Sequence, residues 1–251
     1  MGQHSSSEKG AIGSAIMVGE DDDAPEQQQS NQTVTSGKQG GATTSSGGYV
    51  SKNKINESIQ IVSIEKDNED EYDFLVKVVL VGDYGVGKTS LAKKISQRGF
   101  TTQHQPTIGI DFVVCTLVLN TKETVRLQLW DTAGQEKFKA LASSFFRGAD
   151  GIFIVADVSE KSSFDRIPGF LEDGKKNCSS DVEFIFIASK IDLRTQQLGV
   201  MTEPETKNEF RKYDANIPII ETSAKEDKNV EKALLTIIQR IYNKKKEAKQ
   251  N

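Results

Sequence analysis

The sequence predicts an α/β fold with a six-stranded, mostly parallel sheet that includes one antiparallel strand, and with five helices. Short apolar runs alternate with helical patterns, which is typical of buried parallel strands joined by crossover helices. Two neighbouring segments instead alternate apolar and polar residues on either side of a short polar turn, which indicates a hairpin. The hairpin accounts for the antiparallel strand.

The expected strands are, in chain order, Phe74–Val81, Ile110–Leu119, Thr124–Trp130, Gly151–Val155, Phe184–Ala188 and Ile217–Ile220. The second and third form the hairpin, because the segment between them, Asn120–Glu123, is turn-like. The helices are expected to follow Gly87, Phe138, Ser162, Glu203 and Asp227. Pro204 suits the first turn of the fourth helix, where a missing N–H is tolerated.

The first 70 residues differ in composition from the rest of the chain. They contain no Leu, Phe or Trp, and Ser, Gln, Gly and Thr dominate residues 27–48. Such a segment buries too little apolar surface to offset the entropy of ordering it. We therefore expect residues 1–68 to be a disordered extension, residues 69–246 to form one domain and residues 247–251 to be a flexible tail.

Composition also excludes several classes of protein. Two cysteines, Cys115 and Cys178, are too few for a disulfide framework or a structural zinc site, and this suits the cytoplasm. No apolar run reaches the roughly 18 residues of a membrane span, and the N-terminus lacks the layout of a secretory signal. Because lysines and acids are interspersed in the near-neutral core, nucleic-acid binding is not expected.

A phosphate-binding loop follows the first expected strand directly. Residues 82–89 fit the pattern in which glycines let backbone N–H groups close around a β-phosphate. Lys88 would neutralise β and γ oxygens, and the Thr89 hydroxyl would reach Mg²⁺. The predicted nucleotide-binding residues of this region are Asp83, Tyr84, Gly85, Val86, Gly87, Lys88, Thr89 and Ser90.

Two further segments point to the γ-phosphate. Thr107 lies far enough beyond Thr89 for a helix and a loop that returns over the phosphates, where it would contact both Mg²⁺ and the γ-phosphate and act as a switch; the alternative is an ordinary loop threonine. In Trp130–Glu136, Asp131 would hold Mg²⁺ through water, the Gly134 N–H would reach the γ-phosphate, and Gln135 would orient the attacking water.

Guanine recognition is indicated by two segments that follow later strands. Asp192 could accept both the N1–H and the N2–H₂ of guanine, a pairing that adenine cannot make, and this favours GTP over ATP. The Ala224 N–H could bond guanine O6, while Lys190 and Phe100 pack on the base faces. As alternatives, Lys190 and Asp192 could be a solvated strand end, and Phe100 could be a core residue. The full predicted set is Phe100, Ser189, Lys190, Asp192, Ser223, Ala224 and Lys225.

Together these motifs make residues 72–244 resemble a Ras-superfamily small GTPase, and the Rab family fits best. The resemblance is carried by Ile108–Phe112, Arg126–Trp130, Lys137–Ala142, Phe145–Ala149 and Val155–Ser159.

The resemblance implies a monomeric GDP/GTP switch of vesicle traffic, with Mg²⁺, an exchange factor and a GTPase-activating protein. It also implies that effectors read an apolar switch surface formed by Phe112, Trp130 and Phe145 or Phe146. These aromatics could equally belong to the core; we favour exposure for Trp130 and one of the two phenylalanines.

Two residues depart from the family within the site. Ser189 stands where an asparagine usually bridges the base and the phosphate loop, so nucleotide affinity should fall. Tyr84 occupies a loop-tip position where small residues are usual, and its phenol would obstruct hydrolysis unless the ring points to solvent. The second departure motivates an alternative function, a GTP-bound scaffold that recruits effectors with little hydrolysis. A P-loop kinase is disfavoured, because no segment remains for an acceptor site.

The expected membrane anchor also differs. The chain ends without the prenylated cysteines usual in Rab proteins, whereas its first residues fit the myristoylation pattern with Gly2 as acceptor; the alternative is a plain disordered start. Because one acyl chain binds only marginally, Lys244–Lys246 with Lys249 is a candidate second signal, or alternatively complements the helix dipole. We expect a cytoplasmic protein that attaches reversibly to the cytosolic face of an endomembrane.

Overall fold

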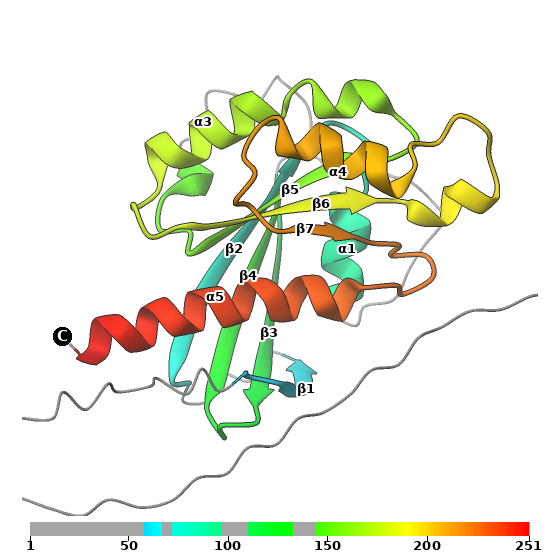
Figure 1. Ribbon diagram of the computed structural model, residues 1–251. Coiled ribbons are helices and arrows are strands. Elements are labelled where there is room, and N and C mark those ends of the chain that lie inside the picture. The colour runs from blue at the N-terminus through cyan, green and yellow to red at the C-terminus, as the bar shows by residue number, and fades with distance from the viewer. Residues whose placement is uncertain (1–57, 67–71, 97–109, 133–143, 251) are drawn as a thin grey trace, which may run out of the picture. The chain divides into compact units, whose positions relative to one another are not determined.

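The computed structural model describes residues 58–66, 72–96, 110–132 and 144–250, and the structural statements below refer to these residues. Its centre is a seven-stranded sheet in the order β1-β3-β4-β2-β5-β6-β7 (Figure 1). The strands are β1 Ile61–Lys66, β2 Phe74–Gly82, β3 Ile110–Leu119, β4 Thr124–Thr132, β5 Gly151–Asp157, β6 Glu183–Ser189 and β7 Ile219–Glu221.

The pairing of the strands matches the prediction in kind. Strands β4, β2, β5, β6 and β7 are parallel, and β3 pairs with β4 as an antiparallel hairpin. The hairpin turn contains Lys122 at φ 68°. The expectation of one antiparallel strand among mostly parallel ones is therefore confirmed.

The described helices are α1 Lys88–Ile95, α3 Ile167–Asn177, α4 Glu203–Arg211 and α5 Val230–Gln250, with 3₁₀ turns η2 Lys161–Phe164 and η3 Ile191–Thr195. Helix α4 begins with a capping box, in which the Thr202 side chain accepts the backbone N–H of Glu205 and the Glu205 carboxylate accepts the backbone N–H of Thr202. The predicted start of the helix after Phe138 lies outside the described residues, and residues 144–146 are helical.

The sheet is covered on both faces, and the side-chain alternation along β2 shows how. Val78 and Leu80 face a core shared with α1 and α5, whereas Val79 and Val81 face a second core shared with α3 and the end of α4. Figure 1 shows α5 crossing one face and α3 and α4 above the other. Because both faces are covered, β5 and β6 are buried along their whole length, and their interiors are apolar without alternation.

The expectation of six strands and of a disordered segment up to residue 68 is wrong at one point. Strand β1 lies inside that segment and pairs antiparallel with the second half of β3, from Ile61 opposite Leu119 to Lys66 opposite Cys115. Ile59 is 2% exposed, and its N–H donates to Gln239 Oε1 at 2.6 Å. A few isoleucines of this segment thus pack in or against the core, although the average composition of the extension did not indicate it.

Candidate nucleotide-binding site

The predicted phosphate loop lies at the carboxyl end of β2, at the sheet edge where ligands bind in folds of this kind. Gly82 has φ 150°, and a β-carbon there would come within 2.2 Å of the Val155 carbonyl oxygen. Gly87 has φ 100° and lies against Ser189. Glycine is therefore favoured at both positions by the backbone conformation, and at Gly82 also by the close approach of β5.

Lys88 is held inside the loop. Its side chain is 5% exposed, and Nζ donates to the carbonyl oxygens of Gly82 at 3.0 Å and Asp83 at 2.7 Å. Burial lowers the pKa of the Lys88 ammonium to about 8, against the opposing pull of the Asp131 and Asp83 carboxylates. A buried cation at the start of a helix beside a glycine-rich turn is suited to anionic oxygens.

Thr89 and Asp131 are in contact although they lie 42 positions apart in the sequence. The Thr89 hydroxyl donates to Asp131 Oδ2 at 2.5 Å, and Asp131 is 1% exposed. The parallel register of β2 and β4 places Leu80 opposite Asp131 and so brings the two motifs together. Hydroxyl and carboxylate oxygens are hard donors of the kind that Mg²⁺ accepts, usually one or two from the protein with the rest from water and phosphate.

The loop tip is braced by a residue that the sequence did not reveal. Asp83 Oδ1 accepts the Tyr84 N–H at 2.8 Å and Arg166 Nη1 at 3.2 Å. Arg166 is the residue before α3, and no local pattern links it to a loop 83 positions earlier. The Tyr84 side chain itself is 57% exposed, which favours the alternative that its ring points to solvent.

The two predicted guanine segments also come together. Asp192 is 7% exposed, and its Oδ1 accepts the hydroxyl of the fully buried Ser223 at 2.6 Å. The Ile191 N–H donates to the Thr222 carbonyl at 3.2 Å. Ala224 is half-buried, whereas Lys225 is exposed. A buried carboxylate in η3, just after β6, thus lies beside the segment that follows β7.

Ser189 contacts the phosphate loop, and the predicted fall in nucleotide affinity stays a prediction. Its hydroxyl lies 2.5 Å from the Val86 carbonyl and 3.0 Å from the Ala156 carbonyl. The link between this position and the phosphate loop is therefore kept in spite of the shorter side chain. Lys190 adopts a left-handed conformation, φ 60°, and its ammonium pairs with the buried Asp157 carboxylate at 2.6 Å.

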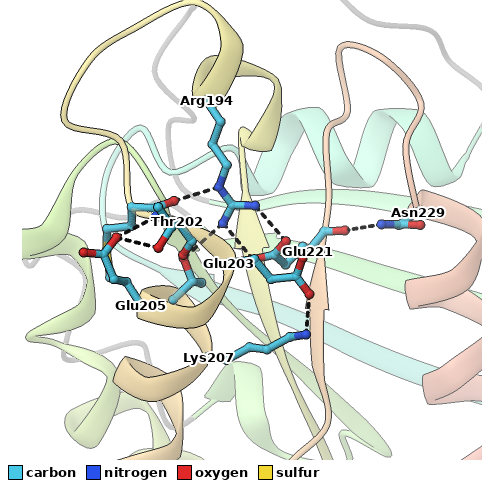
Figure 2. A network of polar contacts seen from close by, with 9 residues as sticks. Arg194, Thr202, Glu203, Glu205, Lys207, Glu221 and Asn229 are labelled. Atoms are coloured by element: carbon cyan, nitrogen blue, oxygen red, sulfur yellow. Dashed lines mark hydrogen bonds and ion pairs between the residues drawn. The ribbon is translucent and has the colours of Figure 1, made fainter. Parts of the chain in front are cut away.

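An ion pair lies just behind the guanine segments and was likewise not predicted. Arg194 contacts both carboxylate oxygens of Glu221 at 2.8 and 2.7 Å, as Figure 2 shows. Arg194 comes from η3 and Glu221 ends β7. A charged residue near each motif was visible in the sequence, but their pairing depends on the alignment of β6 with β7.

Four predicted site residues, Phe100, Thr107, Gly134 and Gln135, lie outside the described residues. Their predicted roles therefore stay predictions.

The aromatic residues expected at the switch surface are divided by the structure. Phe112 is 44% exposed and packs edge to face on Trp130, with ring centroids 5.1 Å apart. Lys77 Nζ lies 4.0 Å from the centroid of the half-buried Trp130 ring. Phe145 and Phe146 are both buried, so the expectation that one of them is exposed is wrong. Phe146 packs into the core that β5 shares with α3.

The C-terminal lysines are paired within the domain. Lys244 contacts Glu183 at 2.6 Å, Lys245 contacts Asp150 at 2.7 Å, and Lys246 contacts Glu123 at 2.5 Å. Lys249 Nζ lies 4.2 Å from the centroid of the Phe74 ring. These contacts dock the end of α5 on the domain and give no support to a role of the run as a second membrane signal. Within the described part of the chain, no helix combines the length and apolar character of a membrane span.

Comparison with known proteins is consistent with this geometry. Residues 77–243 match the family model described as "Ras family". The chain is 39% identical over 173 residues to "Ras-related protein Rab-8B" of Homo sapiens, which covers 69% of this chain and 81% of that protein. It is 38% identical over 176 residues to "GTP-binding protein ypt3" of Schizosaccharomyces pombe, covering 69% and 79% respectively.

Proposed function

Because the chain belongs to the Ras family of small GTPases, we propose that it is a Rab-like GDP/GTP switch that hydrolyses GTP and regulates membrane traffic. One observation carries the proposal. The pair Thr89 and Asp131 and the pair Asp192 and Ser223 lie at the same edge of the sheet, with the buried Lys88 at the start of α1. Phosphate chemistry and base recognition are thereby provided within one site.

Each side chain has a distinct task in this proposal. Lys88 binds the β- and γ-phosphate oxygens, and its buried ammonium is already oriented by the loop carbonyls. Asp192 accepts the two N–H groups of guanine while Ser223 fixes the rotation of its carboxylate. Thr89 and Asp131, with Thr107, would hold Mg²⁺, which when bound neutralises charge on the phosphate oxygens. Gln135 would orient the attacking water.

Partner recognition belongs to the same proposal. Phe112 and Trp130 offer an apolar contact beside the site, with Lys77 on the Trp130 ring. Effectors would bind this surface in the GTP state, and an exchange factor and a GTPase-activating protein would set its timing.

Attachment to an endomembrane would come from myristoylation of Gly2. A Gly2→Ala protein should then leave the membrane fraction of a cell lysate and appear in the soluble fraction. A Gly2→Ala protein that sediments with membranes as the natural chain does would refute this anchor.

Single-turnover hydrolysis tests the enzymatic proposal. The purified chain, loaded with GTP and Mg²⁺, should release phosphate without any partner at a rate on the order of 10⁻⁴ s⁻¹, as unassisted relatives do. Tight binding of GTP with no measurable phosphate release would instead support the second candidate, a GTP-bound scaffold.

Tyr84→Ser separates the two candidates further. If the phenol obstructs hydrolysis, this variant should cleave GTP faster than the natural chain. The Tyr84 side chain is 57% exposed, which favours the alternative that the ring points to solvent. Equal rates in the two proteins would show that the ring does not obstruct the reaction.

A further inference from the structure

We propose that the ion pair between Arg194 and Glu221 positions the two base-reading segments and so sets the discrimination of guanine from related purines. Neither residue is expected to touch the nucleotide, so both are positioning residues. This inference rests on the proposed function, because it concerns how accurately Asp192 would be presented to the base.

The geometry of the pair makes it a rigid connection. Arg194 Nη1 lies 2.8 Å from Glu221 Oε2, and Nη2 lies 2.7 Å from Oε1. The side chains are 21% and 12% exposed respectively. Two parallel bonds between a planar guanidinium and a carboxylate fix orientation as well as distance, and low solvent exposure strengthens them.

The pair joins the same two segments that carry the predicted base readers. Arg194 lies two residues after Asp192 in η3, and Glu221 lies two residues before Ser223 at the end of β7. The Ser223 hydroxyl donates to Asp192 at 2.6 Å, and the Ile191 N–H donates to the Thr222 carbonyl at 3.2 Å. The ion pair adds a charged, bidentate contact between the same two segments.

Both members of the pair are themselves anchored, as Figure 2 shows. Arg194 Nε donates to the Met201 carbonyl at 2.7 Å, and Nη2 donates to the Thr206 hydroxyl of α4 at 3.1 Å. On the other side, Asn229 Nδ2 donates to the Glu221 carbonyl at 2.7 Å. The pair therefore connects η3 to α4 through Arg194 and β7 to the start of α5 through Glu221.

A carboxylate that accepts two N–H groups of one base has to be placed accurately, within about 0.5 Å and 10–20°. The Thr195 hydroxyl donates to the Asp192 carbonyl at 3.0 Å, so a tilt of η3 would carry the Asp192 backbone with it. Loss of the Arg194 contact removes the strongest tie against such a tilt. The hydrogen bond to the base should weaken more than the contacts to the phosphates.

The variants Glu221→Gln and Arg194→Lys test the inference in the full-length chain. The first removes the negative charge, and the second keeps the positive charge but loses the planar fork. A pocket of about 350 Å³ borders the pair, so neither replacement requires repacking. The matched control is Glu203→Gln, which breaks the neighbouring exposed pair of Glu203 with Lys207 on α4.

The measurement is the ratio of the dissociation constants for inosine diphosphate and GDP, obtained by competition with a fluorescent GDP, together with the melting temperature of each variant. Inosine diphosphate lacks only the 2-amino group that Asp192 would read. We expect the ratio to fall about tenfold in Glu221→Gln, the low end for one charge-assisted hydrogen bond, and severalfold in Arg194→Lys. Glu203→Gln should keep the natural ratio.

An equal loss of affinity for both nucleotides, with the ratio unchanged, would overturn the inference, since it would show that the pair only stabilises the fold. If Glu221→Gln does not fold, the Arg194→Lys ratio decides alone in the same way. A natural chain that binds both nucleotides equally would refute guanine reading by Asp192 itself, and the inference would fall with it. The two failures are therefore distinguished by the behaviour of the natural chain.

Discussion

Ser189→Ala should accelerate nucleotide release, because the serine hydroxyl connects β6 to the phosphate loop. Ser189 is 6% exposed, and its hydroxyl lies 2.5 Å from the Val86 carbonyl. Removing it loses a hydrogen bond with a net contribution of about 1 kcal/mol and leaves a buried carbonyl without its donor, which costs about 1–3 kcal/mol. If about 1–2 kcal/mol of this appears in the release step, release accelerates about fivefold to thirtyfold.

The assay loads the protein with a fluorescent GDP analogue and follows its displacement by excess GDP. The matched control is Ser163→Ala, because Ser163 is also buried and its hydroxyl bonds the Asp157 backbone at the end of the neighbouring strand. Ser163→Ala should lower the melting temperature but leave the release rate unchanged. A rate for Ser189→Ala within twofold of the natural chain, or equal acceleration in the control, would refute the tether.

Two other substitutions test the fold around the site. Gly82→Ala places a β-carbon 2.2 Å from the Val155 carbonyl and should destabilise the folded protein by about 1–3 kcal/mol or more. Its control, Gly169→Ala, lies in α3 with open space around it and should stabilise the folded protein by about 0.5–1 kcal/mol. Thermal unfolding compares the two variants, and equal melting temperatures would contradict the clash. Glu123→Gln should lower urea stability at pH 7, and this loss should vanish in acid; a loss independent of pH would show that the charge of Glu123 is not its cause.

The sign of the acid effect follows from the pKa of Glu123. Burial alone would raise this pKa, but hydrogen bonds from Lys246, Tyr242 and Thr121 outweigh burial and hold it below the ordinary value of 4.5. A carboxyl whose pKa is lowered by folding stabilises the folded state fully above its unfolded pKa. The contribution is lost as the pH falls below 4.5 and through the lower folded value.

The parts of the site that the sequence predicted are those encoded by contiguous motifs. These motifs lie at the ends of strands that are recognised by their apolar runs, and parallel strands end at one edge of the sheet. They include Gly82, Gly87, Lys88 and Asp131. The pairing of Thr89 with Asp131 follows from that topology without further information. Local pattern and global fold agree at these residues.

The features that were missed depend on packing between distant segments. Arg166 reaches Asp83, and Arg194 reaches Glu221, only because the sheet brings their elements together. The burial of Phe146 depends likewise on its packing in the core that β5 shares with α3. Strand β1 was missed because it follows a long polar segment, and the average composition outweighed a six-residue segment with only three apolar residues.

Strand β1 also affects how the protein behaves when it is shortened. A chain that begins at residue 69, where composition places the start of the domain, lacks Ile59 and strand β1, the antiparallel partner of β3. The backbone groups of Cys115–Leu119 would then form a bare sheet edge, the kind of surface on which a second chain can add a strand. Strand β1 should therefore protect this edge of the sheet against self-association, and a shortened chain should begin no later than residue 58.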